Sequence, residues 1–153
     1  MDNDYDYNLV ILGDPKAQKR HRTITKGRGG HQLPFARTYD PSAIDKRDIL
    51  RVVQAGAPEK PLDEPLRVDI KLYYQRPKGH YGTGRNSGKL KSSAPLWHTK
   101  KPDRDNADKI ILDALSGIFW RDDSLICAGE ITKQYSDKPR TEIYIKLIKE
   151  NTK

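Results

Sequence analysis

Residues 65–75 read PLRVDIKLYYQ and carry the strongest strand signal in the chain. Every second residue from Leu66 to Tyr74 is apolar or aromatic, and most of the residues between them are charged. A period of two over this length predicts a strand with one face packed on the core and the other exposed. The remaining elements can be assigned outward from this strand.

Three further stretches are typical of strands. They are NLVILG (8–13), SLICAGEITKQY (124–135) and TEIYIKLI (141–148). We expect the last two to form an antiparallel meander pair, with Gly129 at a bulge.

Two helices are predicted between the strands. The first covers about 42–55, starting at Pro41 and Ser42 and ending at Gly56. The second begins near Asp105 and ends at Ser116 and Gly117, and it would bury an apolar stripe made of Ala107, Ile111, Ala114, Leu115 and Ile118. These elements predict an α/β (α+β) fold, a small mixed β-sheet of about four to five strands with two main helices, in a single domain over 1–153.

Two long segments are basic, at about 14–37 and 76–101, and the whole chain has a formal net charge of +8. The first segment fits either a basic loop or a loose hairpin. The second contains no acidic residue, and a loop this long is usually functional or disordered, so we expect it to become ordered on a polyanion. A merely solvated basic surface is the alternative. The candidate DNA-binding residues are Lys16, Lys19, Arg20, Arg22, Arg76, Lys78, Arg85, Lys100, Lys101 and Arg104.

Carboxylates gather in an otherwise basic chain within PDRDN (102–106) and at Asp122 and Asp123. One aspartate alone would be explained as a helix cap. If the Asp122–Asp123 pair lies near the start of the helix, however, three or more carboxylates converge and need a cation. Mg²⁺ fits because it prefers oxygen ligands, and no spacing of His and Cys supports zinc.

Lys109 lies one helical turn after Asp105, and two interpretations of it are equally supported. It could form an ordinary surface ion pair with little effect on stability. Alternatively, it could stabilise charge that develops on a scissile phosphate. A hard-metal site beside basic segments implies phosphate chemistry, in which the metal activates a water molecule.

Other features restrict the class of protein. The single cysteine, Cys127, excludes an internal disulfide, and its apolar neighbours predict a buried, inert thiol. No apolar run approaches the roughly 20 residues of a membrane helix, and the N-terminus is acidic. We therefore expect no membrane partner and a cytoplasmic location, nucleoid-associated when the protein is on DNA.

The stretch PDRDNADKIILDAL, followed by GIFWRDDSLI, resembles the motif of RusA-type Holliday junction resolvases. That motif is P-D-x-D-N-x-x-K, then D-A-L, then one or two apolar residues and D-D, and the match spans residues 102–126. The glycine-rich insertion before it is longer here than in the family, which affects the junction-binding surface more than the chemistry.

The resemblance implies a homodimeric, Mg²⁺-dependent endonuclease that resolves four-way DNA junctions by paired symmetric nicks in recombination and repair. Mn²⁺ would substitute for Mg²⁺. The implied catalytic residues are Asp103, Asp105, Lys109 and Asp123, of which the three aspartates hold the metal. Asp122 is a supporting candidate for the metal, and Asp113 is a candidate partner for Lys109. Asp108 fills a variable position and receives no role.

Two other functions stay open on the sequence alone. One is a metal nuclease for other branched DNA such as flaps and forks, and the other is a non-catalytic protein that binds DNA junctions. The candidates for stacking on unpaired bases are His80, Tyr81, Trp97 and His98. The candidates for a dimer surface, each of which would equally suit the core, are Leu96, Trp97, Phe119 and Trp120.

Overall fold

The structure is a computed structural model that describes residues 4–150. Its strands are β1 (Tyr7–Leu12), β2 (Arg22–Lys26), β3 (Gln32–Tyr39), β4 (Leu66–Gln75), β5 (Ile126–Ala128), β6 (Ile131–Ser136) and β7 (Arg140–Leu147). Its helices are α1 (Ala43–Val53) and α2 (Arg104–Leu115). Short 3₁₀ turns occur at Gln54–Gly56, Lys78–His80, Gly84–Asn86 and Asp123–Leu125. Within residues 4–150, no helix has the length and apolar content needed to cross a membrane.

Strand β4 lies at the centre of a five-stranded sheet, with β7 and then β1 on one side and β5 and β6 on the other. Strand β7 is antiparallel to β4, whereas β5 and β6 are parallel to it. The mixed sheet with two main helices confirms the predicted fold class. The predicted meander pair is wrong, because β4 lies between β6 and β7. The chain returns through α2 after β4, and such a crossover brings the next strand back parallel to the first.

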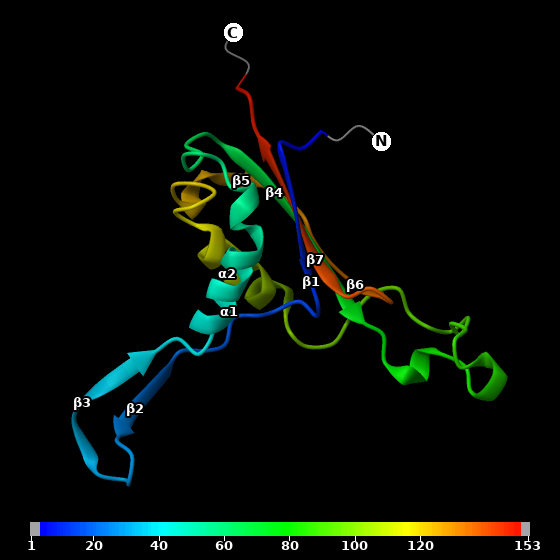
Figure 1. Ribbon diagram of the computed structural model, residues 1–153, viewed down its shortest axis with the longest axis horizontal. Coiled ribbons are helices and arrows are strands. Elements are labelled where there is room, and N and C mark those ends of the chain that lie inside the picture. Colours follow the sequence, from blue (N-terminus) through cyan, green and yellow to red (C-terminus); the bar gives the residue numbers. More distant parts are fainter. Residues whose placement is uncertain (1–3, 151–153) are drawn as a thin grey trace.

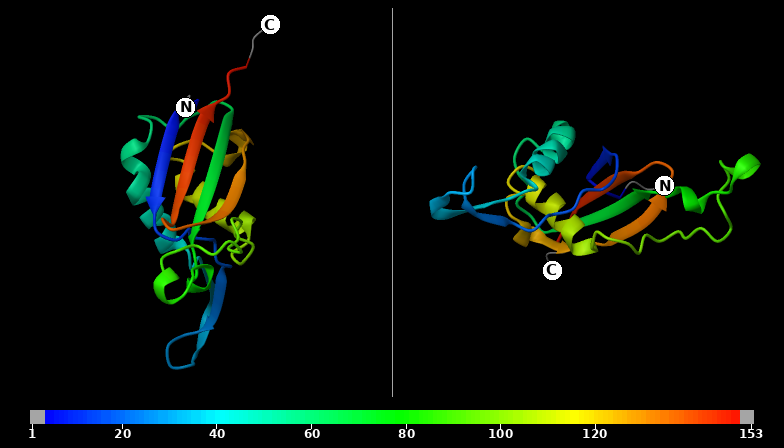
Figure 2. Two further views of the ribbon diagram at one scale, coloured as in Figure 1. Left: turned by 90° about the vertical axis from the view of Figure 1, so that its right-hand side faces the viewer. Right: turned by 90° about the horizontal axis from the view of Figure 1, so that it is seen from below.

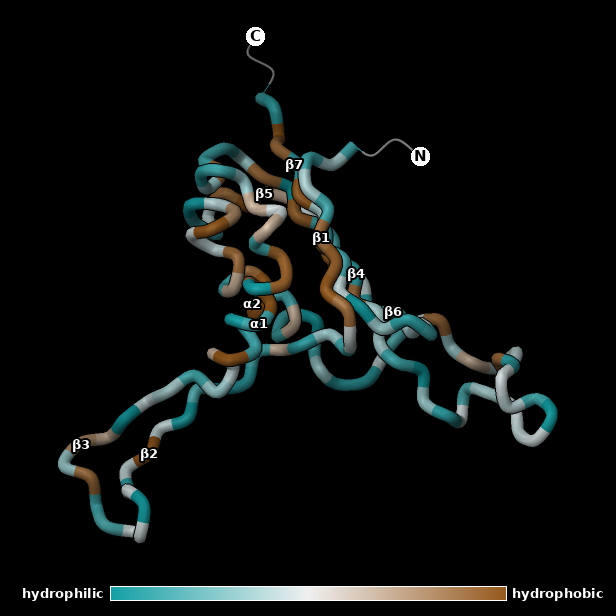
Figure 3. The backbone as a smooth tube through the Cα atoms, in the orientation of Figure 1, coloured by the Kyte–Doolittle hydropathy of each residue, from teal (hydrophilic) through white to brown (hydrophobic). Residues whose placement is uncertain are grey.

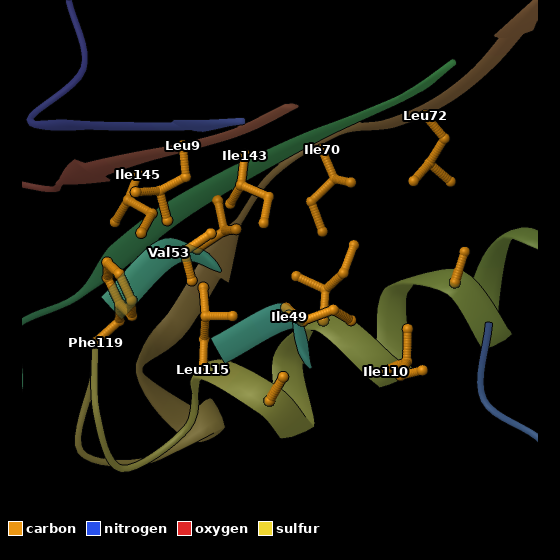
Figure 4. Packing of buried hydrophobic residues seen from close by; sticks show 14 of the residues in the cluster. Leu9, Ile49, Val53, Ile70, Leu72, Ile110, Leu115, Phe119, Ile143 and Ile145 are labelled. Carbon is orange, nitrogen blue, oxygen red and sulfur yellow. The ribbon is translucent and has the colours of Figure 1, made fainter. Parts of the chain in front are cut away.

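Both helices cover one face of the sheet, and the core lies between them and the inward residues of β4 and β7 (Figure 4). The alternation predicted for β4 is confirmed: Leu66 and Leu72 are fully buried, while Lys71 is exposed. Phe119 and Trp120, in the turn after α2, are also fully buried, so both are core residues. Ile118, by contrast, is 41% exposed, and Ile110 takes the buried position that the predicted stripe missed.

Gly129 separates β5 from β6, but the irregularity in the pairing with β4 falls at Cys127, two residues before the predicted bulge. The φ of Gly129 is +155°, and a Cβ atom there would lie 1.9 Å from the main-chain oxygen of Val68. Only glycine therefore allows the chain to approach β4 this closely. The neighbouring Cys127 is exposed, not buried as predicted, because β5 is a three-residue edge strand with little covering it.

Two arms project from the same end of the body in different directions (Figures 1 and 2). Strands β2 and β3 pair only with each other, so the first basic segment forms a hairpin, one of its two predicted alternatives. We call residues 22–39 the hairpin arm. The second arm, residues 76–101, contains two 3₁₀ turns and runs directly into α2.

Candidate active site

Helix α2 begins at the PDRDN motif, with Asp103 at the N-cap position and Asp105 in the first turn. Asp103 has the extended backbone of a cap residue, but its side chain makes no capping hydrogen bond. Its carboxylate instead accepts a hydrogen bond from Lys101 Nζ and forms an ion pair with it at 2.9 Å. Capping therefore does not account for Asp103, and both aspartates are exposed.

Lys109 is exposed one turn further along α2 and forms no ion pair with any of residues 4–150. The predicted Lys109–Asp113 pair is wrong. Asp113 accepts a hydrogen bond from Lys46 Nζ on α1 at 3.1 Å, because α1 packs against this part of α2. The Lys109 ammonium is therefore available to a ligand.

The second carboxylate pair lies in the turn between α2 and β5. Asp122 accepts a hydrogen bond from the main-chain N–H of Ser124 at 3.0 Å, and its bonding to Ser124 holds the pKa of Asp122 below its usual range. Asp123 accepts a hydrogen bond from the indole N–H of Trp120 at 2.7 Å. Because Trp120 is fully buried, this bond ties the Asp123 carboxylate to the core.

Asp108 is the partly buried aspartate of α2. Burial raises the pKa of Asp108, the guanidinium of Arg104 opposes this, and the negative charges of Asp123 and Asp105 raise it further. Its side chain lines a pocket that also includes Cys127 and Gly129. Sequence analysis assigned no role to Asp108, although its i, i+3 spacing from Asp105 was the available signal.

The ligand types fit a hard divalent cation, since every candidate ligand atom is a carboxylate oxygen. However, no group of three or more His, Cys, Asp or Glu side chains within residues 4–150 lies close enough to hold a metal ion. The expected pocket of three converging carboxylates is therefore not preformed in a single chain. The carboxylate of Asp103 is engaged by Lys101 and that of Asp123 by Trp120, which gives the physical reason.

Lys133, on β6, holds the segment that leads into the motif. Its ammonium donates to the main-chain oxygens of Lys100 at 2.7 Å and Pro102 at 2.6 Å. Burial lowers the pKa of Lys133, and the nearby charge of Asp103 partly offsets this. Lys133 lies opposite Leu72 in the parallel register, on the helix-covered side of the sheet. It thus fixes the main chain just before Asp103. Sequence analysis missed Lys133, since its position in a strand suggested no role.

The predicted DNA-binding residues differ in how they are held. Arg76 is partly buried, donates to the main-chain oxygen of Pro95 at 2.8 Å and lies over the ring of Tyr135. Lys101 is paired with Asp103, as described above. Lys16 and Lys19 each lie 3.9 Å from the carboxylate of Asp45. The exposed residues that form no ion pair within 4–150 are Arg20, Arg22, Lys78, Arg85, Lys100 and Arg104.

Three of the four stacking candidates make contacts within the protein. His98 is buried and stacks on Tyr74, with ring centroids 3.9 Å apart, so it is not free to stack on a base. His80 packs edge-on against Tyr135. Tyr81 donates a hydrogen bond to Asp137. Trp97 is 53% exposed and available for stacking on a base. Leu96, a candidate for the dimer surface, is exposed to the same extent.

Comparisons with known proteins identify the family of this chain. The family described as "Endodeoxyribonuclease RusA" matches residues 13–146, which include both arms and both carboxylate groups. A curated relative, "Uncharacterized protein YqaN" of Bacillus subtilis (strain 168), is 32% identical over 143 residues, covering 92% of this chain and 95% of the relative. The fold, the motif at the start of α2 and these matches agree, and the chain belongs to the RusA endodeoxyribonuclease family.

Proposed function

We propose that this protein is a Mg²⁺-dependent, structure-specific endodeoxyribonuclease that resolves four-way DNA junctions during recombination and repair. The observation that carries the proposal is the exposed PDRDN motif at the start of α2, within a family match that spans most of the chain. The acidic start of α2 directly follows one basic arm and adjoins the root of the other. A polyanion that binds both arms would pass over the motif.

Asp103, Asp105 and Asp123 would hold the metal ion, with Asp122 as a supporting ligand. Mg²⁺ commonly takes only one or two carboxylates from a protein and completes its shell with water and substrate phosphate. A site whose carboxylates do not converge in advance is consistent with this coordination preference, because the DNA phosphate would complete the ligand set. When bound, Mg²⁺ or Mn²⁺ would polarise the phosphoryl oxygen and supply an activated water.

The side chains contribute the remaining chemistry. Lys109 forms no ion pair within residues 4–150, so its ammonium would stabilise the negative charge that develops on the scissile phosphate. The bond from Trp120 fixes the orientation of Asp123, and the bonds from Lys133 fix the main chain before Asp103. Preset orientation of this kind lowers the cost of reaching the reactive geometry.

A homodimer would match the symmetry of the substrate. Opposed strands of a four-way junction are related by a two-fold axis, and a two-fold dimer presents two identical sites to them. Each chain would then make one nick, and the two nicks would be symmetric. The exposed lysine and arginine side chains of the two arms would neutralise backbone phosphates, so the affinity for DNA should fall steeply as the salt concentration rises.

The test is a panel of labelled four-way, three-way, flap and linear DNA substrates, each incubated with and without Mg²⁺. We expect paired nicks in the four-way junction only when the metal is present. The Asp105→Asn variant should lose nicking by roughly a thousandfold or more, because a metal ligand is removed. The same variant should still bind the junction, since the surface becomes less negative.

Each alternative function predicts a different pattern. Faster cutting of flaps or forks than of four-way junctions would indicate a nuclease for other branched DNA. Junction binding without metal-dependent nicks would indicate a protein that only binds DNA. Nicking by Asp105→Asn at the wild-type rate would rule out the assigned role of Asp105.

A further inference from the structure

The hairpin arm has no partner within the described chain. Every residue of β2 is exposed, and in β3 only Leu33 is partly buried. Two strands alone are marginally stable in water. The arm therefore keeps a surface that a partner can cover, and its register shows what that surface is.

The register sorts the arm into two unlike faces. Arg22 lies opposite Tyr39 and Ile24 lies opposite Arg37, so these four residues share a face. The register shifts beyond Ile24, and Phe35 joins this face because the Arg37 guanidinium lies over its ring. We call this set the apolar face of the arm. The reverse face carries small side chains such as Thr23 and Thr38, whose hydroxyls lie 2.9 Å apart in a hydrogen bond.

The apolar face is open to solvent despite its composition. Phe35 is 64% exposed, Tyr39 is 44% exposed and Ile24 is 42% exposed. In Figure 3 the tube of β2 and β3 includes short hydrophobic stretches far from the body. The guanidinium of Arg37 lies 5.9 Å from the centre of the Phe35 ring, so a cationic plane and an aromatic plane are presented together.

Charge identifies the partner. Residues 15–39 contain seven lysine and arginine residues and no carboxylate. This excess favours a polyanion over a second copy of a chain whose net charge is +8. Nucleotides with an unstacked base fit both properties, because the base has a free π-face for stacking and each phosphate needs a cation.

The arm is rooted beside the catalytic motif. The main-chain N–H of Gln18, just before β2, donates to the main-chain oxygen of Asn106 in α2 at 2.8 Å. At the other root, Asp40 accepts hydrogen bonds from the Gln18 amide at 2.8 Å and from Lys46 Nζ at 2.7 Å. Both ends of the arm are thus tied to α1 and to the residue after Asp105.

We propose that the apolar face of the hairpin arm binds the base faces that are left unstacked at the branch point of DNA, with Phe35 as the main stacking residue. The proposal rests on the proposed function, which it deepens by separating contacts to bases from contacts to phosphates. Arg22 and Arg37 would bind phosphates of any DNA. Phe35 would discriminate branched from linear DNA, because the interior of a linear duplex is continuously stacked and exposes no base faces.

The experiment compares wild type with Phe35→Ala, Phe35→Trp and the control Leu12→Ala, whose target residue is 81% exposed on β1. Affinity for a four-way junction and for a linear duplex of equal length is measured by fluorescence anisotropy without Mg²⁺ at several salt concentrations. We expect Phe35→Ala to weaken junction binding about tenfold, the loss of one base–aromatic stack, and duplex binding less than twofold. The salt dependence should not change, because no charge is lost.

The other variants sharpen the result. Phe35→Trp should restore junction affinity and quench 2-aminopurine placed at the branch point, and Leu12→Ala should behave as wild type. An equal loss on junction and duplex, or no loss on either, would overturn the proposal. A Phe35→Ala protein that sediments as a smaller species than wild type would also overturn it, by assigning the face to a second copy.

Failure of this proposal can be told from failure of the proposed function. The wild-type preparation is assayed in parallel for Mg²⁺-dependent nicks, which test the function without reference to Phe35. Nicking by wild type together with unchanged junction binding by Phe35→Ala rejects only the proposal that the hairpin arm binds bases. Selective loss of junction binding in Phe35→Ala without wild-type nicking rejects only the nuclease.

Discussion

The start of α2 and the hairpin arm are held in opposite ways. Segments around the motif are fixed by donors from other elements: Lys133 bonds to the main chain before Asp103, Trp120 bonds to Asp123, and Gln18 bonds to Asn106. Among the described strands, β2 and β3 of the hairpin arm pair only with each other. The difference teaches that the fold holds the main chain around the motif, whereas the metal pocket and the binding surface of the arm are left for DNA to complete.

Removing the Lys133 hydrogen-bond donor tests whether the fold positions the motif. We expect Lys133→Met to slow nicking by about tenfold or more, because the freed segment lets Asp103 move out of position while the aliphatic stem is kept. Junction binding without metal should stay within about twofold of wild type. Single-turnover nicking over a range of Mg²⁺ concentrations measures the effect, which should include a higher metal requirement.

Two matched variants make this test specific. Lys133→Arg keeps a cationic donor and should recover part of the rate, whereas Lys138→Met alters an exposed lysine in the turn after β6 and should change nothing. Full activity in Lys133→Met at low Mg²⁺ would show that the contacts to Lys100 and Pro102 do not position the site.

A smaller effect, on the pH dependence of stability, is expected at His98 in the buried root of the second arm. Burial lowers the pKa of His98, so the folded protein favours its neutral form. As pH falls below about 6.5, the unfolded chain takes up a proton that the folded chain resists, and stability is lost. His98→Phe should remove this loss, an effect on the order of 1 kcal/mol, while keeping the stack on Tyr74.

Urea unfolding at pH 7.5 and 5.5 measures this difference. The control is His21→Phe, which changes an exposed histidine at the root of the hairpin arm. The account of His98 fails if wild type and His98→Phe lose the same stability between the two pH values.

Elements set by local patterns could be predicted from the sequence. The alternation of residues 66–74 gave β4, and the apolar stripe behind PDRDN gave α2 and its start. In both of these cases, the signal lies within one helix or one strand. The candidates Asp103, Asp105, Lys109 and Asp123 came instead from the resemblance to the RusA motif.

Features that depend on distant contacts could not be predicted. Nothing near Lys133 indicates that its ammonium reaches Pro102, 31 residues away in the chain. The position of β4 between β6 and β7 depends on the crossover through α2, and the exposure of Cys127 follows from it. Asp108 gains its surroundings only when the turn with Asp123 folds back on α2.

The central claim is that the two carboxylate groups bind one metal ion, and Mn²⁺ affinity in the presence of junction DNA tests it most directly. Electron paramagnetic resonance titrations would compare wild type, Asp103→Asn, Asp123→Asn and the control Asp48→Asn, whose carboxylate is exposed on α1 and paired with Arg51. The account predicts that Asp103→Asn and Asp123→Asn each weaken Mn²⁺ binding by at least about tenfold, while Asp48→Asn does not. Wild-type affinity in Asp123→Asn beside a loss in Asp103→Asn would contradict it.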